Sequence, residues 1–207
     1  LLAAGVKAGT SILSAYDVYG ATYAICGRLF PELGVRAKFV DVTNLEELQK
    51  ALLEARPAAV ILETISNPLM KVADIPTICN LAHQIGAKVI VDNTFATPFL
   101  YRPIQHGADF CVHSTTKYLN GHSDSVGGCV VTTHPEDAER IGWLQNTVGA
   151  ILSPMDSFLV LRGIKTLPVR MERHDASGRK IAAWLAGSRK ISAVHYPGLK
   201  THPQHAL

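Results

Sequence analysis

The sequence of 207 residues predicts an α/β fold with a largely parallel β-sheet. In its middle part, short apolar runs alternate with segments whose apolar residues recur at the spacing of an amphipathic helix. The runs are continuously apolar, which is typical of strands that are covered on both faces. Polar residues follow three of these runs, as expected where parallel strands end at a shared edge of a sheet.

The first two predicted elements are a helix and a strand. Thr43 can cap a helix that places Leu45, Leu48 and Leu52 on one face. Charged and amide side chains occupy the other face, so we expect this helix to lie on the surface of the domain. The apolar run Ala58–Leu62 follows as a buried strand.

A second helix and three further strands come next. The helix begins after Asp74 and stops at Gly86, and its apolar stripe runs from Ile75 to Ile85. The strands are expected from the short apolar runs Lys88–Val91, Phe110–His113 and Cys129–Thr132.

The last part of the chain has helical spacing. Apolar residues recur at helical intervals from Leu152 to Leu185, with interruptions near Gly163 and Pro168. Lys190–His195 is expected to form the first strand of a second unit. The sequence therefore divides near residue 186 into a large domain, 1–185, and the start of a second domain, 186–207.

Composition excludes several classes of protein. The chain is 47% hydrophobic with a net charge of +3, which argues against intrinsic disorder. Lysine and arginine are dispersed along the sequence, so we expect no nucleic-acid partner. No apolar run reaches the roughly 18 residues that a membrane-spanning helix needs, so no membrane partner is expected either.

The cysteines and histidines indicate neither disulfides nor a metal site. Cys26, Cys79, Cys111 and Cys129 form no CxxC pair, and we expect buried, reduced thiols and a cytoplasmic location. The nine histidines show no convincing metal-ligand spacing. The chain starts at Leu1 and stops abruptly at Leu207, so we also expect it to be part of a longer protein.

The polar residues that follow the predicted strands carry the candidate chemistry. Since parallel strands end at one edge of a sheet, we expect these groups to lie together. They are Glu63-Thr64-Ile65-Ser66-Asn67-Pro68, Asp92-Asn93-Thr94 and Ser114-Thr115-Thr116-Lys117.

These residue types fit one cofactor. A buried carboxylate such as Asp92 needs a cationic or protonated partner, although a turn or capping role is the alternative. Lys117 is by default a solvated amine, but a partly desolvated lysine can form a Schiff base. The hydroxyl groups of Ser114 and Thr116 suit a phosphate. Lysine, aspartate and hydroxyl donors together predict pyridoxal 5′-phosphate (PLP).

The ordered motifs closely resemble the Cys/Met-metabolism family of PLP enzymes, which includes cystathionine γ-lyase, cystathionine γ-synthase and methionine γ-lyase. The resemblance covers essentially the whole chain and implies the type I fold of PLP-dependent transferases. Neither GxGxxG nor GxxxxGK[ST] is present, which argues against a nucleotide-binding module. The matching stretches are Tyr19-Gly20-Ala21-Thr22, Glu63–Pro68, Val91–Thr94, Ser114–Asp124 and Gly149–Arg173.

The resemblance implies a role for each candidate site residue. Lys117 would bind the cofactor covalently and later move protons between substrate carbons. Tyr19 would stack on the cofactor ring and assist proton transfer to the leaving group. Asp92 would pair with the pyridinium nitrogen, and Asn67 would bind the phenolic oxygen.

The remaining positions would support the cofactor less directly. Ser114 and Thr116 would hold the phosphate of the cofactor. Glu63 and Asn93 would stabilise the residues that touch it, and His122 would be structural.

The implied function is γ-elimination or γ-replacement on a sulfur amino acid. Cystathionine γ-lyase and γ-synthase activities are nearly level. Ala21 and Ser123 favour both of them over methionine γ-lyase, because methionine γ-lyases usually have Cys and Gly at these two positions. Methionine γ-lyase and O-acetylhomoserine sulfhydrylase are the alternatives. A different alternative is a non-catalytic fragment, since the family's N-terminal arm, its Ser-Gly-Met phosphate loop and its C-terminal carboxylate-binding arginine are missing. The resemblance also implies a homotetramer.

Overall fold

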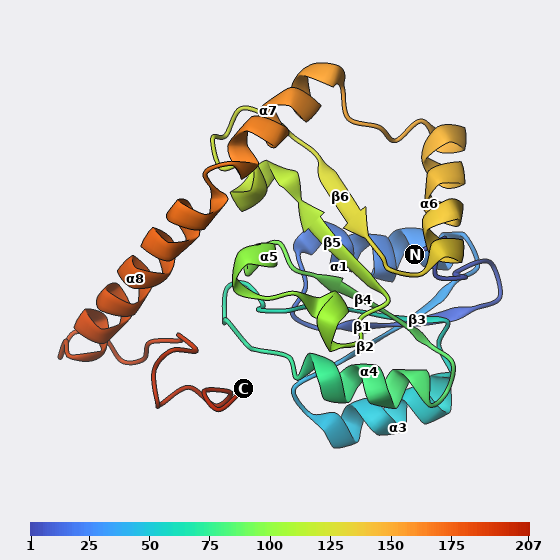
Figure 1. Ribbon diagram of the computed structural model, residues 1–207. Coiled ribbons are helices and arrows are strands. Elements are labelled where there is room, and N and C mark those ends of the chain that lie inside the picture. Colours follow the sequence, from blue (N-terminus) through green and yellow to red (C-terminus); the bar gives the residue numbers. More distant parts are fainter.

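A computed structural model describes residues 1–207 and contains one six-stranded sheet in the order β2-β1-β3-β4-β5-β6 (Figure 1). The first five strands are parallel and β6 is antiparallel to β5, which confirms the predicted α/β fold with a mostly parallel sheet. The strands are β1 Ser11–Ala15, β2 Arg36–Val40, β3 Ala59–Glu63, β4 Lys88–Asp92, β5 Phe110–Ser114 and β6 Gly128–Val131.

Helices connect and cover the strands. Shorter helical segments lie at Ile25–Leu29, Pro103–His106 and Thr115–Leu119. The α-helices are α1 Gly20–Ala24, α2 Phe30–Glu32, α3 Leu45–Ala55, α4 Ile75–His83, α5 Thr97–Leu100, α6 Pro135–Val148, α7 Pro154–Ile164 and α8 Leu167–Ala186. None of these helices is long and apolar enough to span a membrane.

The sheet separates two hydrophobic layers. Helices α3 and α4 cover one face, whereas α1 and α6 lie on the other side (Figure 1). Leu48 of α3 and Ile78 of α4 are fully buried against the apolar side chains of β1, β3 and β4. On the other face, Ile12, Ile90 and Phe110 pack with buried residues from the N-terminal part of the chain. Both faces of the central strands are therefore covered, as their continuous apolar sequences predict.

The observed helix starts refine the sequence-based prediction. Asp74 caps α4 as predicted, because its carboxylate accepts a hydrogen bond from Thr77 N at 3.2 Å. The predicted cap of α3 at Thr43 is wrong: the Thr43 hydroxyl donates to Asp41 Oδ1 at 2.7 Å. Asn44 caps α3 instead, accepting from the main-chain N–H of Glu47 at 3.1 Å.

The C-terminal part of the chain differs from the prediction in one element. Helices α7 and α8 occupy the segment of helical spacing, and α8 extends away from the sheet (Figure 1). The predicted strand Lys190–His195 is not formed, since this segment pairs with no strand of the sheet and most of its residues are exposed. Regular structure ends at Ala186, and residues 187–207 form turns and irregular chain.

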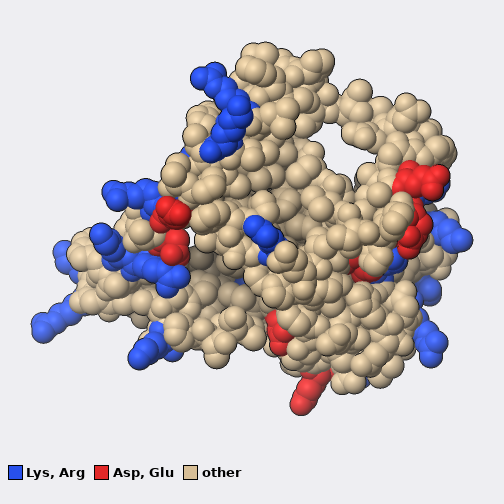
Figure 2. Space-filling view, in the orientation of Figure 1, with Lys and Arg blue, Asp and Glu red and all other residues tan.

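The cysteines and the charged side chains agree with the sequence analysis. All four cysteines are free; Cys26, Cys79 and Cys111 are buried, and Cys129 is half-buried. Figure 2 shows the lysine and arginine side chains of one face as separate groups, with acidic side chains between some of them.

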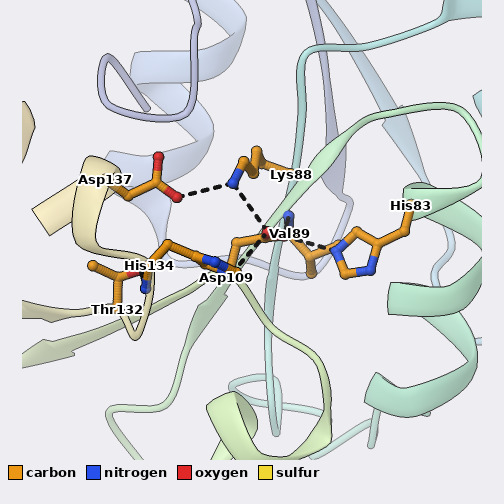
Figure 3. Close-up of polar contacts among 7 residues, drawn as sticks. All are labelled: His83, Lys88, Val89, Asp109, Thr132, His134 and Asp137. Carbon is orange, nitrogen blue, oxygen red and sulfur yellow. Dashed lines mark hydrogen bonds and ion pairs between the residues drawn. The ribbon is translucent and has the colours of Figure 1, made fainter.

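A network of charged groups joins the amino ends of β4 and β5 to α4 and α6 (Figure 3). The buried Asp109 carboxylate accepts from Val89 N at 2.7 Å and lies 2.9 Å from His83 Nε2. Lys88 Nζ lies 3.4 Å from the Asp109 carboxylate and 2.9 Å from the carboxylate of Asp137. The network thus fixes helices from both layers to the same edge of the sheet.

These contacts also set the ionisation of Asp109. Burial alone would raise the pKa of the carboxyl, but the bonds from Val89 and His83 and the charge of Lys88 outweigh burial. The pKa of Asp109 therefore lies below its ordinary value of 3.8. A carboxyl whose pKa is lowered on folding stabilises the fold above its unfolded pKa and loses that contribution as the pH falls.

Asp109→Asn is expected to lower the free energy of unfolding at pH 7 by about 2 kcal/mol, because the charge-assisted bonds are lost. The loss should shrink as the pH falls below 3.8, where the parent carboxyl begins to be protonated as well. Urea denaturation of both chains across this pH range measures the difference. Asp175→Asn, which removes an exposed pair with Arg179, is the control and should cost less than about 0.5 kcal/mol. An Asp109→Asn chain as stable as the parent at pH 7 would contradict the expectation.

Candidate active site

A cavity of about 310 Å³ lies where β3, β4 and β5 end. All six residues predicted to form the site line this cavity, although they come from four separate segments of the chain. The lining residues are Tyr19, Glu63, Asn67, Asp92, Thr94, Phe95, Ser114, Thr116, Lys117 and Val126.

Strand register brings the acidic groups together. Glu63 and Asp92 are paired positions at the ends of the adjacent parallel strands β3 and β4. Because paired residues of neighbouring strands point to the same face, both carboxyls face the same side of the sheet. Ser114 ends β5, the next strand in the sheet.

Thr94 fixes Asp92 within the cavity. Its hydroxyl donates to Asp92 Oδ1 at 2.5 Å, and its main-chain N–H donates to the same oxygen at 2.9 Å. The same hydroxyl accepts from the main-chain N–H of Ser114 at 2.8 Å. Thr94 therefore links two predicted cofactor contacts, a role that the sequence analysis did not assign. An aspartate followed two residues later by threonine is a local turn pattern that could have indicated it.

Lys117 lies in a short helical segment, Thr115–Leu119, that directly follows β5. Its backbone leaves the helical region, with φ −92° and ψ −123°. The lysine side chain is exposed and forms no ion pair. A lysine without an ionic partner at the rim of a cavity is free to react with an electrophile such as an aldehyde.

Arg170 of α8 binds the segment that carries Lys117. Its guanidinium donates to the carbonyl of Tyr118 at 2.7 Å and to that of Gly163 at 2.9 Å. Its Nε also donates to Thr166 Oγ1 at 3.0 Å. One side chain therefore joins the Lys117 segment to the connection between α7 and α8.

Gly163 makes the contact between α7 and this segment possible. A Cβ atom at position 163 would collide with the main-chain atoms of Asn120. The neighbouring His122 has a local contact, with its ring Nδ1 2.7 Å from the carbonyl of Asn120.

Tyr19 and Asn67 complete one side of the cavity. The side chain of Tyr19 is 66% exposed, and its main-chain N–H donates to Glu63 Oε1 at 2.7 Å. Asn67 is exposed and precedes Pro68 in the connection after β3. The buried Asn93 supports this edge by accepting from Thr64 Oγ1 at 2.7 Å and donating to the carbonyl of Tyr101 at 2.8 Å.

The two predicted phosphate-binding hydroxyls differ in their contacts. Thr116 Oγ1 accepts from Gly127 N at 3.0 Å and lies 3.3 Å from the carbonyl of the same residue. The Ser114 hydroxyl makes no hydrogen bond within the chain, so it is available to a ligand.

Comparison with known proteins now identifies the family. The sequence matches the family described as Cys/Met metabolism PLP-dependent enzyme over residues 1–207. The chain belongs to this family. Among Cys/Met-metabolism enzymes, it is 50% identical over 201 residues to the cystathionine beta-lyase of Lactococcus lactis subsp. cremoris, a match that covers 97% of this chain and 53% of the relative. It is 43% identical over 201 residues to the cystathionine gamma-lyase of Bacillus subtilis, with the same two shares covered.

Solved structures of the family share the fold. The structure of cystathionine gamma-lyase from Lactobacillus plantarum complexed with L-serine superimposes with a TM-score of 0.95 at 37% identity. The match covers 99% of this chain and 54% of that one. The chain thus spans about half the length of the Cys/Met-metabolism relatives that it matches and shares the fold of the part that the match covers.

The cavity suits the cofactor of the Cys/Met-metabolism family. It combines an unpaired lysine, an oriented aspartate and a free serine hydroxyl. A protonated heterocyclic nitrogen would complement Asp92, an aldehyde would react with Lys117, and a phosphate would accept from Ser114. The residues present therefore fit PLP.

Gly163→Ala is expected to lower the free energy of unfolding by about 1–3 kcal/mol, because the new methyl group collides with main chain that cannot move aside easily. Gly142→Ala in α6 is the matched control. A Cβ there meets open space, so this change should stabilise the chain by about 0.5–1 kcal/mol through helix propensity. Urea denaturation measures both changes, and equal effects of the two substitutions would exclude the proposed contact.

Thr94→Val is expected to weaken PLP binding about tenfold, because valine keeps the shape of threonine but cannot orient Asp92 or accept from Ser114 N. Thr94→Ser keeps the hydroxyl and should restore most of the affinity. Titration of each chain with PLP, followed by absorption and by quenching of protein fluorescence, gives the dissociation constants. If serine and valine weakened binding equally, the hydroxyl would have no positioning role.

Proposed function

We propose that this chain is the cofactor-binding part of a PLP-dependent enzyme that eliminates or replaces the γ-substituent of a sulfur amino acid. The main support for this proposal is that one cavity is lined by all six predicted site residues: Lys117, Asp92, Tyr19, Asn67, Ser114 and Thr116. Relatives named cystathionine gamma-lyase and cystathionine gamma-synthase support the substrate class.

Each residue has a role in this proposal. When bound, PLP supplies a protonated ring that withdraws electrons from the carbon atoms of an attached amino acid. Lys117 holds the cofactor through its Nζ and, once released, takes and returns protons at the substrate carbons. Asp92, oriented by Thr94, holds a proton on the ring nitrogen. Tyr19 covers the ring and donates a proton to the departing sulfur.

The remaining contacts position the cofactor in this proposal. Asn67 donates to the phenolic oxygen of the ring. Ser114 donates to the phosphate, and Thr116 joins it while its hydroxyl remains close to Gly127. These are roles for side chains that already line the cavity, so no large rearrangement is required.

β-Elimination is a second candidate reaction, because the relative at 50% identity is named cystathionine beta-lyase. The two reactions are distinguished by their products from cystathionine. γ-Elimination consumes water and releases cysteine, 2-oxobutanoate and ammonia, whereas β-elimination consumes water and releases homocysteine, pyruvate and ammonia. Chromatography of the keto acids formed by the whole enzyme therefore separates the two reactions.

We further propose a division of the chain near residue 186, with residues 1–185 in the large domain and 186–207 opening a second one. The end of α8 at Ala186 supports this boundary. A cytoplasmic homotetramer is the assembly that we propose for the whole enzyme.

Lys117→Ala is expected to abolish the visible absorption band that added PLP produces in the parent chain, because the covalent attachment is lost. Borohydride should fix PLP on Lys117 in the parent, which peptide mapping detects. Lys165→Ala, which removes another exposed lysine, is the control and should leave the band unchanged. Failure of the parent to form the band would favour the alternative of a non-catalytic fragment. Labelling spread equally over several lysines would contradict the role of Lys117.

A further inference from the structure

A second carboxyl group lies beside Asp92 in the cavity. Glu63 is paired with Asp92 across β3 and β4, and it is only 9% exposed. Both residues line the cavity, and no other acidic residue does so. Two like charges in such a position disfavour each other, so one of the two carboxyls is expected to bind a proton more readily.

The contacts of Glu63 differ from those of Asp92. Its Oε1 accepts from the main-chain N–H of Tyr19 at 2.7 Å, at the start of α1. Its Oε2 is buried and forms no hydrogen bond within the chain. Asp92, by contrast, receives two hydrogen bonds from Thr94, one from its main-chain N–H and one from its hydroxyl. Glu63 therefore has one oxygen that is bonded and one oxygen on which a proton can reside.

Glu63 has no ion-pair partner among the charged side chains near it. Lys71, on the connection after β3, has its Nζ 2.7 Å from the Asp17 carboxylate and 3.3 Å from the Asp41 carboxylate, so it is already shared between them. Lys117 lines the same cavity but forms no ion pair with Glu63. Burial raises the pKa of Glu63 to about 7; the bond from Tyr19 opposes this rise, whereas the charges of Asp92 and Asp17 add to it.

We propose that Glu63 is a positioning residue that works as a neutral acid: it holds the main chain of Tyr19 and leaves Asp92 as the one anionic side chain in the cavity. The inference rests on the proposed function, since it concerns the residues that would contact PLP. Its consequence is that the hydrogen-bond acceptor of Glu63 matters and its negative charge does not.

Two substitutions of similar size separate these properties. Glu63→Gln keeps an acceptor for Tyr19 N–H but cannot ionise, whereas Glu63→Met keeps the volume and removes the acceptor. In the chain without PLP, amide hydrogen exchange at Tyr19 should stay slow in Glu63→Gln and become faster in Glu63→Met. With PLP, Glu63→Gln should bind within about twofold of the parent, and Glu63→Met about tenfold more weakly.

The pH dependence of stability gives an independent measurement. A carboxyl whose pKa rises from 4.5 to about 7 on folding stabilises the fold at low pH, and this contribution is lost as the pH increases through 7. Glutamine does not titrate. The melting temperature of Glu63→Gln relative to the parent should therefore increase between about pH 4.5 and about pH 7 and level off above that range.

Infrared spectroscopy detects the proton directly. The parent chain at pH 6 should show a protonated-carboxyl band that is absent from Glu63→Gln. Loss of PLP affinity in Glu63→Gln equal to that in Glu63→Met would overturn the proposal, because charge would then be essential. Fast exchange at Tyr19 in both variants, or a pH-independent difference in melting temperature, would overturn it as well. The exchange, infrared and melting measurements need no PLP, so they separate this inference from the proposed cofactor binding.

Discussion

The parallel pairing of β3, β4 and β5 is the constraint on which the rest of the structure depends. It brings the ends of three buried strands to one edge, so that Glu63, Asp92 and Ser114 lie near one another although they are far apart in the sequence. Helices cover both faces of these strands, so the packing of apolar side chains in the two layers fixes the register of the strands. A slip of one residue in β4 would turn Asp92 to the opposite face of the sheet, away from the cavity.

The central strands and the two helices around them were predictable, because each strand is a continuous apolar run and each helix has apolar residues at helical spacing. The strands β1 and β2 were not. The sequence Ser11–Ala15 is buried throughout, but two of its five residues are serines. Their hydroxyls bond to the carbonyls of Ala55 and Ala15, so they tolerate burial that their polarity argues against. In Arg36–Val40, charged residues interrupt the apolar pattern.

The candidate site was predictable to the extent that chemistry follows residue type and position. Lys117 and Asp92 follow buried strands of a parallel sheet, at the edge where polar groups from neighbouring strands meet. Arg170 and Gly163 could not be found in this way. Their contacts with the Lys117 segment span more than forty residues of sequence. The partner atoms belong to the main chain, which every residue has, so the type of the partner residue does not indicate the contact. The orientation of Asp92 by Thr94 could be predicted only in part. The bond between the two residues is local in sequence, but the position of Thr94 also depends on the pairing of β4 with β5.

The close approach of α7 to Asn120 limits how this chain can vary over evolution. At most positions of a helix, a glycine can be exchanged for alanine with a gain in stability. Position 163 is different, because any side chain there would require α7 to move outward or the chain after Lys117 to be rebuilt. Selection on the lysine that we propose to hold the cofactor would therefore act also on Gly163, which does not line the cavity. A change at this glycine in a related sequence would indicate that the geometry around the lysine has diverged, even where every reactive residue is retained.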